Sequence, residues 1–222
     1  MNTVLIPIKG LHAAKSRLGP ELDDSERARL VLVLAERVVC AATAARGVDR
    51  VLVVTRDERL LELASAWHAE AVREHGGESE PDALNAALDE GRRHAIAAGA
   101  TRLAVVVADL PMVEPDDIAA VFDALASGAG VVLARAHDGE GLGALGLTPA
   151  DAVPFRFGDG RALRHHAAAA EARGLATVVL DRSGLAFDLD TAEDLAACRA
   201  SLPMGWERIH VDRASEVGAT RR

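Results

Sequence analysis

The 222-residue sequence predicts an α/β fold with a mainly parallel, doubly wound sheet. Two observations lead to this prediction: short apolar runs alternate with longer segments that carry apolar residues at helical spacing, and the joins between them are short. Such an alternation places helices on both faces of one sheet. We expect a single domain over residues 1–202, followed by a patternless tail at 203–222 for which mobility is the hypothesis.

Seven apolar runs are predicted as strands because they are short and rich in Val, Leu and Ile. The run at 103–107 carries this pattern most clearly, and the run at 70–73 carries it weakly. The first run is expected to be a central strand covered on both faces, with Pro7 at its end. In chain order, the predicted strands span residues 3–8, 51–55, 70–73, 103–107, 131–134, 144–147 and 177–180.

Six segments are predicted as helices from their apolar spacing and their end signals. Acidic and capping residues at 21–25 precede the first, Pro115 suits the first turn of the fourth, and Gly174 ends the fifth. Thr191 and Asp194 form a capping-box pattern before the last. The predicted helices span residues 28–45, 57–67, 82–98, 116–126, 161–173 and 191–201.

The segment 135–160 departs from this alternation. It begins with polar residues, becomes Gly-rich over 139–143, and contains Pro149 and Pro154. We expect it to be an insertion over the edge of the sheet.

Composition excludes several classes of function. The formal net charge is −9, aromatic residues make up 3% and Tyr is absent, so no nucleic-acid partner is expected. No apolar run approaches the ~20 residues that span a bilayer, so we expect no membrane association and a cytoplasmic location. Cys40 and Cys198 lie in helical apolar patterns and are predicted to be buried free thiols.

The loop after the first strand concentrates a particular kind of charge. The chain has 25 basic residues but only two lysines, Lys9 and Lys15, and both lie here. An ammonium is a compact, mobile point charge suited to phosphate oxygens. Because the loop leaves the carboxyl end of a buried strand, where ligands bind in open α/β sheets, we predict a phosphate-binding loop. The alternative is a solvated surface loop.

Three aspartates are candidate metal ligands. Asp188 and Asp190 are two residues apart, so both side chains project to one side if the backbone is extended. Asp109 follows a different strand and would complete an oxygen ligand set for Mg²⁺. Alternatively, Asp190 caps the helix that begins near Thr191, and Asp109 caps a turn or the next helix.

Carboxylate metal ligands opposite a lysine loop favour phosphoryl or nucleotidyl transfer, in which charge sits on phosphate oxygens. The nucleoside triphosphate would not be bound by a P-loop, since the sequence contains no GxxxxGK[ST].

Six short motifs in the same order give the chain a resemblance to the guanylyltransferases of deazaflavin coenzyme F(420) biosynthesis, over residues 3 to 200. The matching residues are Pro7-Ile8-Lys9, Ala14-Lys15-Ser16-Arg17-Leu18, Leu84-Asn85-Ala86, Asp109-Leu110-Pro111, Phe157-Gly158 with Arg164-His165, and Asp188-Leu189-Asp190-Thr191. The resemblance implies a nucleotidyltransferase fold of the glycosyltransferase-A-like kind. It also implies transfer of GMP from GTP to 2-phospholactate, phosphoenolpyruvate or 3-phosphoglycerate, with release of pyrophosphate.

The resemblance further implies roles for individual residues. Catalytic roles fall to Lys9, Lys15 and Asp109, and Mg²⁺ would be held by Asp109, Asp188 and Asp190. Lys9 would contact the acid substrate, Lys15 and Arg17 the triphosphate, and Asn85 would lie near the nucleotide. Leu142, Gly158 and Arg161 would line the site of the acid substrate. A downstream enzyme of coenzyme assembly is a further implied partner.

Two positions depart from the family pattern. Gly141-Leu142-Gly143 stands where the family usually has Gly-Thr-Asn or Gly-Thr-Ala, and Arg161 stands where it usually has Ser. Two hydroxyl contacts to the acid substrate are therefore missing, and Arg161 is a candidate to grip a carboxylate instead. A changed acid substrate is the resulting hypothesis. His166 is expected to be a solvated helix residue.

Other interpretations stay open. Residues 141–146 match GxGxxG, which would suggest a dinucleotide-binding oxidoreductase, although no helix is expected after them. A non-catalytic nucleotide-binding protein, or cytidylyl or molybdopterin-guanylyl transfer on the same fold, are further alternatives. Apolar helix faces suit either a core or a dimer seam, so a homodimer also stays open.

Overall fold

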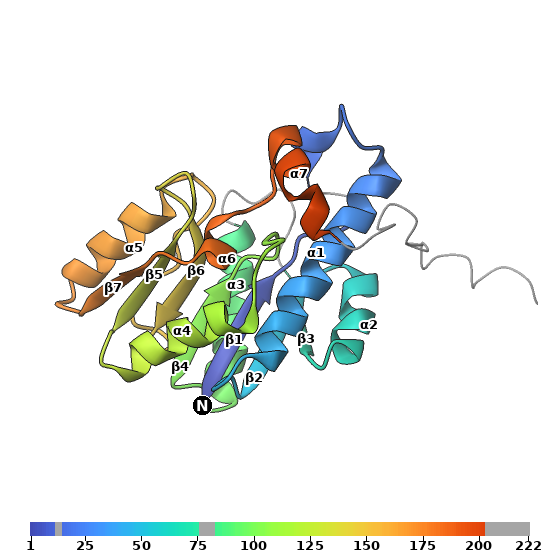
Figure 1. Cartoon of the computed structure of the whole chain (residues 1–222). Helices are drawn as coiled ribbons and strands as arrows, with labels where there is room; N and C mark the ends of the chain where they lie inside the picture. Colours follow the sequence, from blue (N-terminus) through green and yellow to red (C-terminus); the bar gives the residue numbers. More distant parts are fainter. Residues whose placement is uncertain (12–14, 76–82, 203–222) are drawn as a thin grey trace, which may run out of the picture.

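The computed structural model describes residues 1–11, 15–75 and 83–202. Within these residues, seven strands form one sheet in the order β3-β2-β1-β4-β6-β5-β7 (Figure 1). The strands are β1 (Asn2–Pro7), β2 (Arg50–Thr55), β3 (Glu70–Arg73), β4 (Arg102–Val106), β5 (Val131–Arg135), β6 (Leu142–Leu147) and β7 (Thr177–Leu180). All neighbouring strands are parallel except β6, which runs antiparallel to both β4 and β5. The predicted α/β fold is confirmed.

The helices match the six predicted segments, with two short additions at residues 16–18 and 183–186. They are η1 (Ser16–Leu18), α1 (Asp24–Ala44), α2 (Glu58–Ala66), α3 (Ala83–Ala97), α4 (Pro115–Ala126), α5 (Ala162–Glu171), α6 (Ser183–Ala186), α7 (Ala192–Cys198) and η2 (Arg199–Ser201). The first long helix starts four residues earlier than predicted, because Asp23 and Glu26 form a capping box ahead of it. The four-residue helix α6 was not predicted, since it is too short to carry an apolar period.

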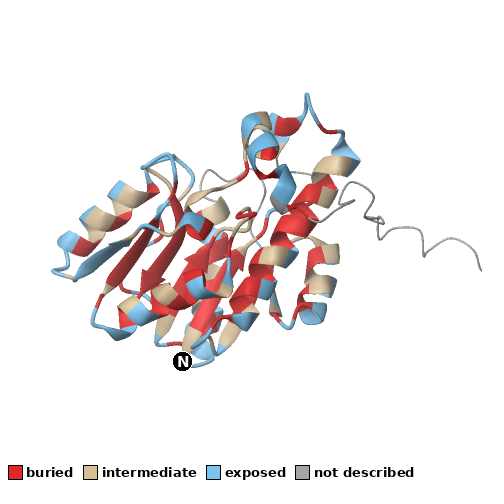
Figure 2. Cartoon of the chain, viewed as in Figure 1, coloured by how far each residue is buried: buried red, intermediate tan, exposed pale blue. Residues whose placement is uncertain are grey.

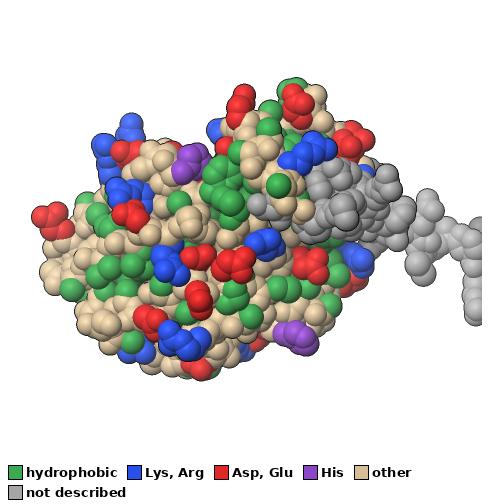
Figure 3. Space-filling model, viewed as in Figure 1, with side chains coloured by type: hydrophobic (Ala, Val, Ile, Leu, Met, Phe, Trp, Pro, Cys, Tyr) green, Lys and Arg blue, Asp and Glu red, His purple; other side chains and the backbone are tan. Residues whose placement is uncertain are grey.

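Two apolar clusters fill the two faces of the sheet. Side chains of α1, α2 and α4 cover one face, and side chains of α3 and α5 cover the other. The central strands are buried on both sides, whereas β7 is exposed at the sheet edge (Figure 2). On the face that carries α1 and α4, acidic and basic side chains are interspersed (Figure 3). Two ion pairs link these elements: Arg37 of α1 pairs with Glu114, the N-cap of α4, and Arg46, just after α1, pairs with Asp123 of α4.

A third, smaller cluster joins both ends of the described chain. Leu18 and Leu22 follow the lysine loop, and Leu189 and Leu195 lie near the C-terminal end; all four are buried together against the first half of α1. Figure 1 shows α7 beside the start of α1. This cluster brings the predicted phosphate loop and the Asp188–Asp190 segment to the same end of the sheet.

The expected insertion over the sheet edge is wrong for its central part. β6 lies inside the sheet, between β4 and β5, and every one of its residues is buried. Its six residues are apolar or glycine, so the strand can be covered on both faces. The GxGxxG match at 141–146 therefore lies mostly within a strand and not in a strand–helix turn, which removes its support for a dinucleotide site.

The predictions for the two cysteines can also be compared with the structure. Cys198 is buried, but Cys40 is exposed, so the prediction for Cys40 is wrong: it lies on the solvent side of α1 although its neighbours in sequence are apolar. Both described cysteines are free thiols. Across the described ranges, no helix combines the length and apolar character needed to cross a membrane. The predicted tail at 203–222 lies outside the described residues.

Gly91 allows α3 to pack closely on the sheet. A Cβ atom at this position would overlap Leu5 Cδ1 and lie 2.7 Å from Val54 Cγ2, and both side chains are fully buried. We expect Gly91→Ala to lower the free energy of unfolding by about 1–3 kcal/mol through overpacking. Chemical denaturation measures this change.

Gly10→Ala serves as the control, because the nearest atom to its added Cβ is Asp57 Oδ2 at an ordinary 3.5 Å. The packing explanation is wrong if the two variants unfold at the same denaturant concentration.

Candidate active site

The lysine loop leaves the carboxyl end of β1 and is held by Asp57, the N-cap residue of α2. The Leu11 N–H donates a hydrogen bond to Asp57 Oδ2 at 2.9 Å. The other oxygen of Asp57 accepts from the Arg59 N–H at 3.0 Å and caps α2. Asp57 therefore fixes the backbone just after Lys9. Sequence reasoning missed this residue, although an Asp before a helix is a recognisable cap signal.

Lys15 ends the loop in an unusual conformation. Its backbone is left-handed, with φ 59° and ψ 35°, which is uncommon for a residue with a side chain. It precedes η1, whose Leu18 is buried in the third cluster. This backbone and the anchored turn behind it direct the Lys15 side chain inward.

The Lys15 ammonium lies between two carboxylates. Lys15 Nζ donates to Asp109 Oδ2 and to Asp190 Oδ1, each at 2.7 Å, and the Lys15 side chain is only 7% exposed. Burial by itself would lower the pKa of Lys15, but the two negative charges and their hydrogen bonds outweigh it and raise that pKa. Lys15 therefore stays charged, and it links residues that are 94 and 175 positions away in sequence.

The backbone brings the two carboxylates together. Asp109 follows β4, and its carbonyl oxygen accepts a hydrogen bond from the Leu189 N–H at 3.0 Å. The N-cap of α7 is Thr191, whose side chain accepts from the Asp194 N–H, so the alternative that Asp190 caps this helix is wrong. The Asp190 carboxylate is thereby free to contact Lys15. Likewise, Asp117 and not Asp109 completes the capping box of α4.

Asp188 is close to this group but is not bridged by Lys15. Burial, followed by the negative charges of Asp109 and Asp190, raises the pKa of Asp188, while nearby His137 partly offsets this effect. His137 Nδ1 lies 3.3 Å from Asp188 Oδ1, a neighbour that the sequence did not reveal. Among the described residues, no three His, Cys, Asp or Glu side chains form a ready metal cluster. In this structure, an ammonium lies between two of the three aspartates that were expected to hold an ion.

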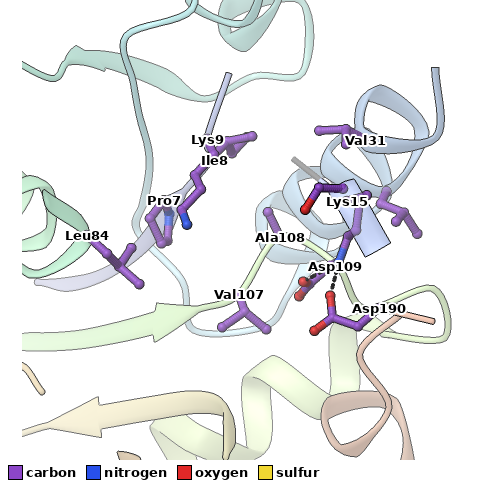
Figure 4. A pocket seen from close by; sticks show the side chains of 12 residues that line it. Pro7, Ile8, Lys9, Lys15, Val31, Leu84, Val107, Ala108, Asp109 and Asp190 are labelled. Atoms are coloured by element: carbon purple, nitrogen blue, oxygen red, sulfur yellow. Dashed lines mark hydrogen bonds and ion pairs between the residues drawn. The ribbon is translucent and has the colours of Figure 1, made fainter. Parts of the chain in front are cut away.

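A cavity of about 370 Å³ opens beside this ion pair. Lys9 is on its other side, across from Lys15, Asp109 and Asp190 (Figure 4). Within the described chain, Lys9 is exposed and makes no ion pair that would neutralise it. The remaining lining residues are Pro7, Ile8, Ser16, Val31, Leu34, Leu84, Val107 and Ala108. The cavity thus combines apolar walls with a free ammonium at one side and a paired ammonium at the other.

Two predicted nucleotide contacts lie outside this lining. Arg17 is exposed on η1. Asn85 is buried, and its amide is paired with the backbone of Phe157: its Nδ2 donates to the Phe157 carbonyl at 3.1 Å, and its Oδ1 accepts from the Phe157 N–H at 2.9 Å. Asn85 therefore anchors the segment before Gly158. Of Leu84 and Asn85, Leu84 alone lines the cavity.

The residues predicted to bind the acid substrate are likewise not part of the cavity lining. Leu142 is buried in the core cluster beneath α3 and α5, whereas Gly158 and Arg161 are exposed at the start of α5. The expectation that His166 is solvated is wrong: it is fully buried, and its Nε2 accepts a hydrogen bond from the Arg156 N–H at 3.2 Å. His166 and Asn85 thus fix the backbone on the N-terminal side of Gly158.

Solved structures support the fold. The chain resembles a protein from Desulfovibrio desulfuricans G20 assigned as a nucleotide-diphospho-sugar transferase, with a TM-score of 0.73, 18% identity, and coverage of 93% of this chain and 90% of the other. It also resembles a nucleotidyl transferase from Methanothermobacter thermautotrophicus, with a TM-score of 0.60, 19% identity, and coverage of 90% and 96%. At these identities the likeness establishes the fold alone.

Sequence comparison establishes the family. A phosphoenolpyruvate guanylyltransferase of Rubrobacter xylanophilus is 44% identical over 197 residues, which cover 89% of this chain and 93% of that protein. A 2-phospho-L-lactate guanylyltransferase of Methanothermobacter thermautotrophicus is 37% identical over 191 residues, covering 86% and 81%. The family model described as "Guanylyl transferase CofC like" matches residues 2–198. The chain therefore belongs to the CofC-like guanylyl transferase family.

Proposed function

We propose that this protein transfers GMP from GTP to a small phosphorylated carboxylate, releasing pyrophosphate, in the biosynthesis of coenzyme F(420). 2-Phospholactate, phosphoenolpyruvate and 3-phosphoglycerate are the candidate acceptors. The observation that carries the proposal is the cavity in which Lys9 faces the group of Lys15, Asp109 and Asp190. It places one ammonium on each side of the cavity, and ammonium groups can stabilise the charges of two phosphorylated reactants.

In the proposed reaction, a phosphate oxygen of the acceptor attacks the α-phosphorus of GTP, and the bond to the β-phosphate bridging oxygen breaks. The phosphoanhydride product and pyrophosphate account for all atoms, so no protein nucleophile is needed. Lys9 is assigned to the acceptor, because it is exposed at the cavity. Lys15 and Arg17 are assigned to the triphosphate, and their task is to hold the reactants in line and to offset negative charge.

Mg²⁺ is the proposed cofactor, with Asp109, Asp188 and Asp190 as the residues that would hold it. The donor set fits, because carboxylate oxygens are the ligands that this hard ion prefers. The three carboxylates are close enough to interact, since burial and then the charges of Asp109 and Asp190 raise the pKa of Asp188. When bound, the ion would neutralise charge that develops on the phosphate oxygens.

The proposal includes a cytoplasmic location and a downstream enzyme that uses the guanylylated acid. A homodimer stays a hypothesis, which the mass of the protein in solution would test.

The first experiment is a pyrophosphate-release assay with each of the four nucleoside triphosphates and each candidate acceptor. We expect release only with GTP together with a phosphorylated acid. Release with CTP instead would support cytidylyl transfer. GTP binding without release under any combination would support a non-catalytic nucleotide-binding protein and contradict the proposal.

Asp109→Asn tests the acidic centre. We expect pyrophosphate release to fall by about 100-fold or more, because Asp109 is a proposed ligand of the ion that would offset charge on the phosphate oxygens. Asp123→Asn is the matched control, because Asp123 is an exposed carboxylate on α4 that pairs only with Arg46 among the described residues. Equal activity of both variants would remove Asp109 from the proposed mechanism.

Arg161→Ser tests acceptor recognition. Arg161 is exposed at the N-terminus of α5, and the charge-assisted hydrogen bonds proposed for it would be lost. We expect kcat/KM for the preferred acid to fall about tenfold or more, mainly through KM, with the KM for GTP unchanged. Arg173→Ser, near the other end of α5, is the control. Equal acceptor KM values in both variants would contradict this role.

A further inference from the structure

The ion pair of Lys15 has a consequence for how a metal can enter the site. We propose that Lys15 is an internal counter-ion that occupies the position of the divalent cation in the metal-free protein and must leave Asp109 and Asp190 before that cation binds. The inference rests on the proposed function, because that function places a cation at these carboxylates. It adds an exchange of one cation for another.

The distances make the two cations mutually exclusive at one pair of carboxylate oxygens. Lys15 Nζ is 2.7 Å from one oxygen of Asp109 and 2.7 Å from one oxygen of Asp190. Mg²⁺ binds carboxylate oxygens at about 2.1 Å, so an ion that used this same pair of oxygens would fall in the space of the ammonium. Two positive charges that share these oxygens would also repel each other strongly in a partly buried site.

Burial makes the exchange a concerted one. The Lys15 side chain is 7% exposed, and within the described residues its ammonium has Asp109 and Asp190 as its ion-pair partners. An ammonium that loses both partners must find other anions or reach water, because an unpaired buried charge is strongly unfavourable. Phosphate oxygens of a nucleotide in the adjoining cavity are suitable replacements, since Lys15 lines that cavity.

Lys15 thereby couples the binding of the cation to the binding of the nucleotide. In the exchange, Lys15 trades its two carboxylates for phosphate oxygens, and the nucleotide enters together with the cation. The cation alone binds weakly, because it must displace an ammonium that then has no partner. Since such coupling is reciprocal, the nucleotide also binds better when the cation is present.

Lys9 provides a matched comparison. It carries the same charge and lines the same cavity, but it is exposed and forms no ion pair with a carboxylate among the described residues. Figure 4 shows the two lysines at the cavity. Lys9→Gln therefore removes a positive charge from the cavity and leaves the ion pairs of Asp109 and Asp190 intact, whereas Lys15→Gln removes a positive charge and also breaks these ion pairs.

The first test measures binding of Mn²⁺, as a spectroscopic substitute for Mg²⁺, to the full-length protein without nucleotide, by titration with electron paramagnetic resonance. We expect Lys15→Gln to bind Mn²⁺ about tenfold more tightly than the wild type, a typical size for coupling between sites. We expect Lys15→Arg, which keeps the positive charge, to stay close to the wild type. The exchange is overturned if Lys15→Gln gains no more affinity than Lys9→Gln, or if Lys15→Arg gains as much as Lys15→Gln.

The second test uses the wild type and does not depend on how the variants fold. Lys9 and Lys15 are the only lysines of the chain, so their rates of acylation by an amine-reactive reagent can be followed separately by peptide mass spectrometry. We expect Mg²⁺ to accelerate the acylation of Lys15 and to leave Lys9 unchanged. An unchanged Lys15 rate at Mg²⁺ concentrations that saturate the site overturns the exchange.

The two proposals fail separately. If Mn²⁺ binds to neither the wild type nor Lys15→Gln, the exchange is overturned, while the pyrophosphate-release assay with GTP still decides whether guanylyl transfer stands. If the exchange is observed but no combination of substrates releases pyrophosphate, the cation site is retained and the proposed function fails.

Discussion

The contact of Lys15 with Asp109 and Asp190 is the interaction on which the arrangement at the carboxyl ends of β1 and β4 depends. Three segments that are far apart in sequence must meet for it to form, and each has its own support. The third apolar cluster holds the turn after Lys15 against the segment that carries Asp190. A backbone hydrogen bond from Leu189 to Asp109 joins that segment to the end of β4. Packing and backbone pairing therefore bring together three charged groups that would otherwise remain in water.

The sheet topology decides where this group lies. β1 and β4 are parallel neighbours, so the loops at their carboxyl ends open on the same side. β6 runs antiparallel next to β4 and is buried along its whole length, and Val107 donates a hydrogen bond to the Gly143 carbonyl at its start. Asn85 spans from α3 to the segment before α5 through its two hydrogen bonds with Phe157, next to the cavity residue Leu84.

Positive charge in this protein is concentrated at one cavity, against a negative net charge of the whole chain. The net charge of −9 gives no long-range attraction for anions, yet both lysines of the chain line one cavity. A buried ion pair is weak evidence for stability, since desolvation cancels much of its attraction. The Lys15 pair is better understood as a means of keeping an ammonium and two carboxylates charged and oriented at the site where we propose that phosphates bind.

The sequence by itself determined the order of the strands and the longer helices, the cap at Thr191 and the N-terminal position of Pro115 in α4, because apolar period and end signals are local properties. It also indicated the candidates Lys9, Lys15 and Asp109, because each lies at the end of a predicted strand or in the loop that follows it. Only the tertiary structure decided that β6 lies inside the sheet, that Asn85 holds Phe157, and that Lys15 contacts the carboxylates. Those outcomes depend on strand pairing and on contacts across 72 to 175 residues, which no local pattern encodes.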